Sequence, residues 1–398
     1  MSFVAVFNSL PMDALLARAE AAPRAAIEGV INKPALTLSD FATLLSPAAD
    51  ELLEAMGRRS RAITQQRFGK TMRLFAPIYL SNECINNCKY CGFSRDNPIL
   101  RVTLTIEEVV REAQALSDQG FRNLLLVAGE HPKFVSTTYL ADCVKALRKS
   151  VPGIALEVGP METEHYRVIA DAGAEGLVVY QETYDRAVYG AMHTAGPKRD
   201  FDWRLATAER AYAAGFRRLG IGALFGLSDW RSDAVCLAAH TAYLLKACWK
   251  SQITVSFPRL RPNAGDFDPL TEMSDRELAR LICAFRIAFP DTGLVLSTRE
   301  PSKLRDGLIP MGITLMSAGS HTEPGGYTGA GRGAIHRTER GRIVEAPGAA
   351  ESIGMGLLTN ATPQFDIADR RSPLEVADHI RRLGYEPVWK DWDAVLSG

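Results

Sequence analysis

Three closely spaced cysteines, Cys84, Cys88 and Cys91, carry the most specific chemistry in this sequence. They occur in the segment Ser-Asn-Glu-Cys-Ile-Asn-Asn-Cys-Lys-Tyr-Cys-Gly, residues 81–92. A site with four thiolates fills every metal valence. A compact CxxxCxxC set instead suits a cubane iron–sulfur cluster, in which the protein holds three irons and the fourth stays open. The spacing therefore predicts a [4Fe–4S] cluster with one iron free to bind a small molecule.

Two other uses of these cysteines fit less well. A zinc site usually needs a fourth Cys or His at ligand spacing, and the next candidate, His131, lies 40 residues beyond Cys91. A disulfide framework is disfavoured because seven cysteines is an odd number and the N-terminal residues do not resemble a secretory signal. The other four are expected to be buried reduced thiols: Cys143, Cys236, Cys248 and Cys283.

An open iron can bind the amino and carboxylate groups of S-adenosylmethionine and pass an electron to its sulfonium. Tyr90, directly before the third cysteine, completes the CxxxCxφC form that is typical of radical S-adenosylmethionine enzymes. The chemistry implied is homolytic, because a 5′-deoxyadenosyl radical takes a hydrogen atom from the substrate. The hypothesis from another class is a non-catalytic iron–sulfur protein for electron transfer or regulation. Such a carrier has no need of an open iron.

The composition agrees with a cytoplasmic enzyme. The 398 residues can bury a large core, and 46% hydrophobic with 23% charged residues is ordinary globular usage. The formal net charge is zero, so we expect no general attraction to nucleic acid or to an anionic membrane. No apolar run approaches the roughly 18 to 20 residues that cross a bilayer. We therefore expect neither a nucleic-acid partner nor a membrane partner.

The elements that must position these residues alternate along the chain. Residues 1–70 indicate an N-terminal helical segment. Eight short apolar runs follow, separated mostly by helical stretches, one of which opens with a capping box of Thr105 and Glu108. The runs are residues 73–80, 123–128, 154–158, 176–180, 219–224, 252–257, 293–297 and 312–316. They predict an α/β fold, a (β/α)8 TIM-type barrel over residues 71–320, with a C-terminal extension over 321–398 that completes the barrel and offers a partner surface.

Polar residues follow nearly every predicted strand, which is where the active site of such a barrel lies. In strand order they are Tyr79, then Gly129 with Glu130 and His131, then Glu157, Glu182, Arg259, Arg299 and Ser317. S-adenosylmethionine and an amino-acid substrate each bring a carboxylate, which a guanidinium binds through two hydrogen bonds. Solvated loop acids and rim salt bridges are the alternatives for these glutamates and arginines.

Six further motifs follow the cysteines along the chain: LLLVAGEH at 124–131, VYQETY at 179–184, SFPRLRP at 256–262, LSTRE at 296–300, PGGY at 324–327 and PVWKDW at 387–392. Taken in order with the cysteines, they resemble the tyrosine lyases of thiamine biosynthesis, the 2-iminoacetate synthases. The resemblance implies that S-adenosylmethionine is cleaved to methionine and the 5′-deoxyadenosyl radical, which takes hydrogen from L-tyrosine. The Cα–Cβ bond of tyrosine then breaks to give 2-iminoacetate (dehydroglycine) and 4-methylphenol. The resemblance also implies that thiazole synthase is the partner that receives the imine, and that reduced flavodoxin or ferredoxin is the electron donor.

Two relatives with the same barrel define the alternatives. The maturase that makes carbon monoxide and cyanide for iron-only hydrogenase also cleaves tyrosine, but it carries a second cluster on C-terminal cysteines. Here no cysteine follows Cys283, which argues against that enzyme. Tryptophan lyases have similar Thr-Arg-Glu and Ser-x-Gly-Ser segments, so L-tryptophan stays open as the substrate.

The resemblance and the strand ends together give each candidate a role. We expect the cluster to be ligated by Cys84, Cys88 and Cys91. We expect S-adenosylmethionine to be bound by Tyr90 beside the adenine, by Gly129 and Glu130 at the methionine moiety, by Glu182 at a ribose hydroxyl or the ammonium, and by Arg259 at a carboxylate. We expect Arg299 to clamp the substrate carboxylate, with Ser317 and Tyr79 orienting the amino group.

Overall fold

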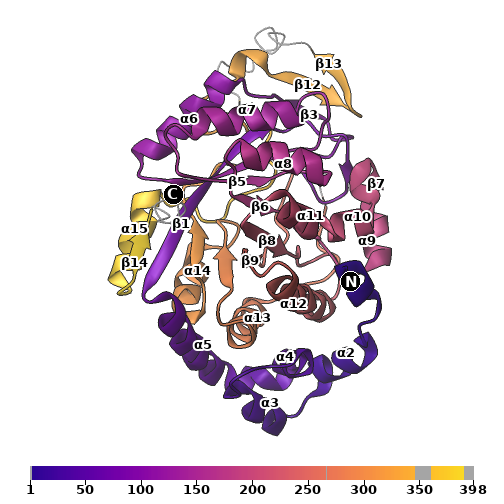
Figure 1. The fold of residues 1–398 in the computed structure, drawn as a ribbon, viewed down its shortest axis with the longest axis vertical. Helices are drawn as coiled ribbons and strands as arrows, with labels where there is room; N and C mark the ends of the chain where they lie inside the picture. Colours follow the sequence, from indigo (N-terminus) through magenta and orange to yellow (C-terminus); the bar gives the residue numbers. More distant parts are fainter. Residues whose placement is uncertain (1, 266, 346–359, 390–398) are drawn as a thin grey trace.

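Eight parallel strands form a closed barrel at the centre of the molecule (Figure 1). The structure is a computed structural model that describes residues 2–265, 267–345 and 360–389. The barrel strands are β1 (Thr71–Ser81), β4 (Asn123–Ala128), β5 (Gly153–Glu157), β6 (Gly176–Val178), β8 (Arg218–Gly222), β9 (Gln252–Ser256), β10 (Gly293–Leu296) and β11 (Leu315–Ser317). They pair in this order, and β11 pairs with β1, with Phe75 opposite Ser317. Each predicted run overlaps one of these strands, so the barrel prediction is confirmed.

Helices between the strands cover the outside of the barrel. They are α6 (Ile106–Asp118), α7 (Thr137–Leu147), α8 (Thr163–Asp171), α9 (Arg186–Met192), α10 (Phe201–Leu205), α11 (Thr207–Ala214), α12 (Trp230–Ala247), α13 (Asp275–Ala288) and α14 (Ser302–Leu308). The predicted capping box of Thr105 and Glu108 opens α6. Val109, Ala113 and Leu116 are buried along one face of that helix, at the spacing that aligns side chains toward a core.

The N-terminal helices lie against the outer helices of the barrel. They are α1 (Phe3–Asn8), α2 (Met12–Ala21), α3 (Arg24–Ile31), α4 (Leu38–Leu44), the 3-10 helix η1 (Pro47–Leu52) and α5 (Leu53–Phe68). Phe3 stacks on His240 of α12 with ring centres 4.0 Å apart. Phe41 packs edge-on against Phe285 of α13 at 5.0 Å. Figure 1 shows α2 to α5 below α12 and α13.

The C-terminal part adds three features to the barrel. The strands β12 (His336–Glu339) and β13 (Arg342–Glu345) form a small sheet with β3 (Ile99–Arg101). The helix α15 (Pro373–Arg382) leads into β14 (Glu386–Val388), which pairs with the start of β1.

Short elements complete the fold: β2 (Asn87–Cys88), β7 (His193–Ala195), η2 (Pro197–Arg199), η3 (Ile309–Met311) and η4 (Arg332–Ala334). The last three residues of the motif at 387–392 lie outside the described residues.

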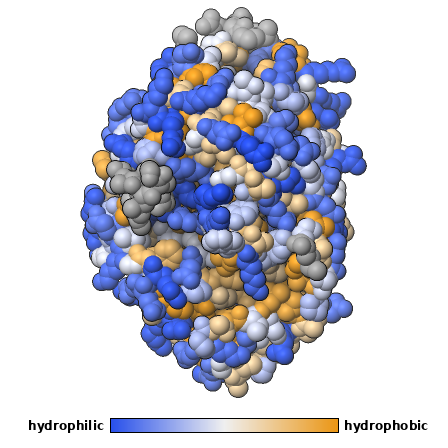
Figure 2. Space-filling model, viewed as in Figure 1, coloured by the Kyte–Doolittle hydropathy of each residue, from blue (hydrophilic) through white to orange (hydrophobic). Residues whose placement is uncertain are grey.

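The surface in the same view is mostly hydrophilic, with smaller apolar patches between the charged groups (Figure 2). This agrees with the balanced composition of 46 basic and 46 acidic residues. None of the helices in the described ranges combines the length and the apolar character needed to cross a bilayer. The division at residues 70 and 320 stays a prediction.

Candidate active site

The loop after β1 carries the three cysteines and lies against the end of β4. The amide of Ile85 donates to the carbonyl of Glu130 at 2.8 Å, and the amide of Gly129 donates to the carbonyl of Ser81 at 3.0 Å. A Cβ at Gly129 would lie 2.2 Å from the carbonyl oxygen of Glu83, so this contact requires glycine. The small size of Gly129 therefore serves the packing of the cysteine loop itself. The expected role of Gly129 at the methionine moiety of S-adenosylmethionine is a different one, and it stays a prediction.

The three cysteines are free thiols that line one cavity. We call it the cysteine cavity, and its other polar lining residues are Asn86, Glu130, Glu157, Tyr180, Glu182, Lys198, Arg204 and Gln364.

The chemistry of the three thiols fits an iron–sulfur cluster. Burial raises the pKa of the Cys84 and Cys88 thiols, because a thiolate loses its solvation there. Bound iron supplies the positive charge that stabilises thiolates in such a place. Three sulfurs from one short loop can therefore hold three irons of a cubane. A cluster held by these cysteines would supply one electron for the reduction of bound S-adenosylmethionine.

Glu182 lies on the wall of the cysteine cavity between two cations. Its Oε1 is 2.7 Å from Nζ of Lys198 and 3.2 Å from Nη2 of Arg204. Burial alone would raise the pKa of this carboxyl, but the charges of Lys198 and Arg204 hold it below its usual value. The backbone φ of Glu182 is 74°, a left-handed conformation that costs a non-glycine residue about 1–3 kcal/mol. A strained, ionised carboxylate on a cavity wall is typical of a functional site.

Glu130 and Tyr90 occupy different positions relative to the cysteine cavity. Oε2 of Glu130 accepts a hydrogen bond from Nδ2 of Asn86 at 2.6 Å, and the same amide nitrogen is 3.8 Å from Sγ of Cys84. Glu130 is therefore held close to the first cysteine. The hydroxyl of Tyr90 is 2.7 Å from Nε2 of His193, and Tyr90 is buried outside the cavity lining. Its predicted contact with adenine stays a prediction.

A second cavity is lined by the residues predicted to bind the substrate. We call it the arginine cavity, because Arg299 lines it together with Tyr79 and Ser317. The guanidinium carbon of Arg299 is 3.3 Å from the centre of the Phe365 ring. Within the described residues its guanidinium forms no hydrogen bond or ion pair, so it can bind a carboxylate.

Tyr79 and Ser317 are fixed by neighbours from distant parts of the chain. The hydroxyl of Tyr79 donates to Oε1 of Gln364 at 2.8 Å, while Nε2 of Gln364 is 3.8 Å from Sγ of Cys91. Oγ of Ser317 accepts a hydrogen bond from the amide of Thr298 at 3.0 Å, so its hydroxyl hydrogen remains available to a ligand. Gln364 therefore links the predicted substrate residues to the cysteine loop.

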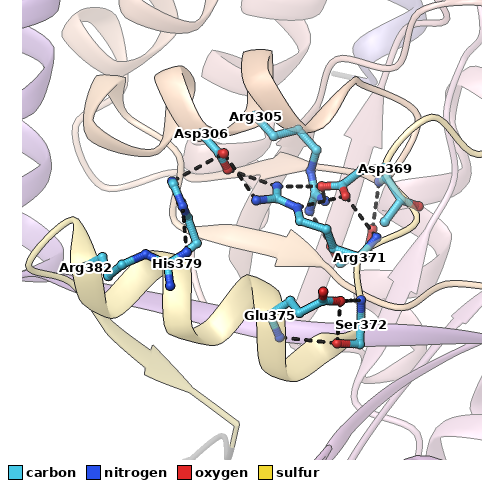
Figure 3. A network of polar contacts seen from close by, with 10 residues as sticks. Arg305, Asp306, Asp369, Arg371, Ser372, Glu375, His379 and Arg382 are labelled. Carbon is cyan, nitrogen blue, oxygen red and sulfur yellow. Dashed lines mark hydrogen bonds and ion pairs between the residues drawn. The ribbon is translucent and has the colours of Figure 1, made fainter.

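A buried ion pair holds the C-terminal segment against these strand ends (Figure 3). Arg305 of α14 pairs with Asp369 and also donates to the carbonyl of Ser317. Arg371 pairs with the same carboxylate at 2.7 Å and with Asp306 at 2.9 Å. Figure 3 shows Asp369 between the two arginines. The network fixes both Ser317 and the segment that carries Phe365.

Arg259 does not reach either cavity. Its Nε donates to Glu300 at 3.1 Å, Nη1 to the carbonyl of Met273 at 2.9 Å, and Nη2 to Asp275 at 2.7 Å. The guanidinium is therefore saturated by protein groups, and Arg259 is absent from the lining of both cavities. Its predicted role in binding a carboxylate of S-adenosylmethionine has no support from this geometry. Arg259 instead forms an ion pair with Glu300, which lines the arginine cavity.

The two cavities meet at a common wall made by Val127, Glu157 and Tyr180. The hydroxyl of Tyr180 donates to Oγ of Ser256 at 3.0 Å. The sequence placed Glu157 at a strand end, but no role followed from that position. The other site residues without a sequence prediction are Asn86, Tyr180, Lys198, Arg204, Ser256, Gln364 and Phe365.

Comparisons with known proteins agree with this geometry. Residues 78–234 match the model of the Radical SAM superfamily, and residues 256–386 match the Biotin and Thiamin Synthesis associated domain. The 2-iminoacetate synthase of Escherichia coli (strain K12) is 40% identical over 392 residues, which cover 98% of this chain and 97% of that protein. The chain belongs to the 2-iminoacetate synthase family. It is therefore a radical S-adenosylmethionine lyase that uses a [4Fe–4S] cluster and S-adenosylmethionine.

Other members and neighbours extend the comparison over the whole chain. The 2-iminoacetate synthase of Salmonella typhimurium is 39% identical over 397 residues, which cover 100% of this chain and 98% of that protein. The X-ray structure of the FeFe-hydrogenase maturase HydG from Carboxydothermus hydrogenoformans is similar with a TM-score of 0.81 and 31% identity. The match covers 98% of this chain and 85% of that chain. The resemblance to 2-iminoacetate synthases is thus confirmed.

Proposed function

We propose that this lyase cleaves the Cα–Cβ bond of L-tyrosine to give 2-iminoacetate and 4-methylphenol, for the thiazole ring of thiamine. S-adenosylmethionine is converted to methionine and 5′-deoxyadenosine in the same reaction. The main support is Arg299, whose guanidinium has no hydrogen bond or ion pair among the described residues and lines a cavity that shares a wall with the cysteine cavity. A guanidinium binds the carboxylate of an amino acid through two parallel hydrogen bonds.

The rest of the arginine cavity suits an aromatic amino acid. Phe75, Phe257, Tyr180 and Leu125 line it, so an aromatic ring can be buried there. Ser256 also lines this cavity with its hydroxyl, and its Oγ accepts a hydrogen bond from the hydroxyl of Tyr180. The deoxyadenosyl radical is unselective, so the protein must choose a hydrogen by position, and a misplacement of about 1 Å can cost on the order of a hundredfold. Clamping the head group at Arg299 is a means of making that choice.

The partners and location are part of the same proposal. An imine hydrolyses in water, so we infer direct transfer of 2-iminoacetate to thiazole synthase. Residues 321–398 are our candidate for the surface that meets this partner, and 346–359 and 390–398 among them lie outside the described residues. Reduced flavodoxin or ferredoxin is the proposed electron donor. All seven cysteines are free, which supports a reducing compartment such as the cytoplasm.

The test is the formation of 5′-deoxyadenosine by the protein with a reconstituted cluster under anaerobic conditions. S-adenosylmethionine and dithionite are supplied with tyrosine, tryptophan, phenylalanine or no amino acid. We expect 5′-deoxyadenosine to form well above background with tyrosine. If none of the aromatic amino acids raises it, the proposed substrate is refuted.

A further inference from the structure

Glu157 has a special place among the acidic residues of the site. It ends β5 and lines both the cysteine cavity and the arginine cavity. Glu130 and Glu182 are each bound to a neighbouring side chain, at 2.6 and 2.7 Å. In the described parts of the chain, the carboxylate of Glu157 has no hydrogen bond or ion pair, and only longer-range charges act on it. A carboxylate that lines both cavities is therefore available to a ligand that spans them.

We propose that Glu157 binds the ammonium group of the amino-acid substrate and accepts a proton from it before hydrogen abstraction. This inference rests on the proposed function. The carboxylate and ammonium of an amino acid share one carbon atom, so their binding groups must lie close together. Arg299 and Glu157 line the same cavity, and Arg299 is the strongest charge acting on Glu157. With the carboxylate on Arg299, the ammonium on Glu157 faces the cysteine cavity, where the radical forms.

The proton transfer balances without any further reactant. One N–H bond of the ammonium breaks, the electron pair stays on nitrogen, and the proton forms an O–H bond with the Glu157 carboxylate. The products are a neutral amine and a neutral carboxylic acid, and no electron changes hands. Loss of a hydrogen atom from the neutral amine leaves a neutral nitrogen radical, whereas loss from the ammonium would leave a cationic one. Prior transfer to Glu157 therefore prepares the group from which hydrogen is taken.

The electrostatic surroundings of Glu157 suit this role. Burial raises the pKa of its carboxyl to about 7, in spite of the nearby charge of Arg299. The titratable and charged groups that line the same two cavities are Arg299 and Glu300 after β10, Tyr79 on β1, the thiols of Cys84, Cys88 and Cys91 after β1, Glu130 after β4, Tyr180 and Glu182 after β6, Lys198 on η2 and Arg204 on α10. A pKa of about 7 is much closer to the pKa of an amino group than the pKa of an ordinary glutamate, which is about 4.3. Such matching is what an efficient proton acceptor needs.

The experiment compares wild type with Glu157→Gln between pH 6.5 and 9.5. Glutamine keeps the size and polarity of the side chain but cannot accept the proton. Iron content and visible absorption confirm equal cluster loading, and 4-methylphenol and 5′-deoxyadenosine are both measured. At pH 7 we expect the variant to form 4-methylphenol about 10²–10⁴ times more slowly, the usual contribution of a general base. Its rate should then rise about tenfold per pH unit until the amino group is deprotonated in solution.

The controls separate proton transfer from simple binding. Glu162→Gln removes an exposed carboxylate at the N-terminus of α8 and should keep the wild-type pH profile. Glu157→Asp can still accept a proton, so it should retain part of the activity with the wild-type pH slope. If Glu157→Gln loses the same factor at every pH, or loses nothing at pH 7, the inference is overturned.

The same experiment tells this inference apart from the proposed function. If wild type makes no 4-methylphenol but does consume tryptophan, the tyrosine assignment fails, and the pH comparison proceeds with tryptophan. If no aromatic amino acid is consumed, both proposals fail.

Discussion

Replacing Arg299 with lysine is the sharpest test of how the substrate is held. The guanidinium of Arg299 lies on the Phe365 ring, with its central carbon 3.3 Å from the ring centre. This stacking leaves the N–H groups at its edge to bind a carboxylate through two hydrogen bonds. Lysine keeps the positive charge, but it loses the planar stacking and one of the two paired hydrogen bonds.

The size of the effect follows from these two contacts. A hydrogen bond to a charged group contributes about 1.5–3 kcal/mol, and a cation–π contact about 0.5–2 kcal/mol. Their combined loss is about 2–5 kcal/mol, and each 1.36 kcal/mol changes a rate about tenfold. We therefore expect tyrosine cleavage to fall by about thirtyfold to several thousandfold. Cleavage of S-adenosylmethionine does not depend on this clamp, so slow, uncoupled formation of 5′-deoxyadenosine should continue.

The assay is the ratio of 4-methylphenol to 5′-deoxyadenosine, measured by mass spectrometry after anaerobic turnover. In Arg299→Lys we expect this ratio to fall at least about tenfold. Arg342→Lys, an exposed arginine of β13, serves as the matched control and should keep the wild-type ratio. An unchanged ratio in Arg299→Lys, at normal cluster content, would refute the carboxylate clamp.

Three further predictions follow from the contacts of the site. Cys88→Ala should abolish cleavage of S-adenosylmethionine while the circular dichroism of the barrel stays unchanged, and full turnover would show that the ligand assignment is wrong. Asp369→Ala leaves the buried Arg305 without its partner, so urea unfolding should show a loss of about 3–5 kcal/mol, and a loss below about 1 kcal/mol would contradict the buried pair. Gly129→Ala forces a methyl group against the Glu83 carbonyl at 2.2 Å, so iron incorporation should fall, whereas normal incorporation would argue against the packing described for the loop.

The Asp369 pair also has a defined pH dependence. Burial raises the pKa of the Asp369 carboxyl, but the hydrogen bonds from Arg371 and the charge of Arg305 bring it below its usual value. A carboxyl whose pKa is lowered on folding stabilises the native state above its unfolded value of about 3.9 and loses that contribution as the pH falls further. Its contribution should therefore be complete at neutral pH, where the Asp369→Ala measurement is made.

The barrel could be predicted because its signals are local. Each barrel strand is a short apolar run, and the capping box of Thr105 and Glu108 marks a helix start within four residues. Closure also follows from the order of the strands, since the eighth strand of a barrel must pair with the first. The cysteine ligands could be predicted for the same reason, because their spacing lies within a single loop.

The remaining parts of the site depend on contacts that local patterns do not encode. Tyr79 and Gln364 are 285 residues apart in the chain, and the segment around Gln364 has no helix or strand periodicity. The position of Arg259 after a strand suggested a free cation, but Asp275 and Glu300 already pair with it. Glu157 is the opposite case, because its carboxylate has no hydrogen bond or ion pair with the residues that the structure describes, and a strand-end position in the sequence does not indicate this.

The most direct test of the central claim offers tyrosine and tryptophan in competition to the reconstituted enzyme and identifies the products by mass spectrometry. We predict 4-methylphenol in proportion to 5′-deoxyadenosine, together with 2-iminoacetate or the glyoxylate formed by its hydrolysis, and no fragment of tryptophan. Fragments of tryptophan alone, or 5′-deoxyadenosine without a fragment of either amino acid, would contradict it.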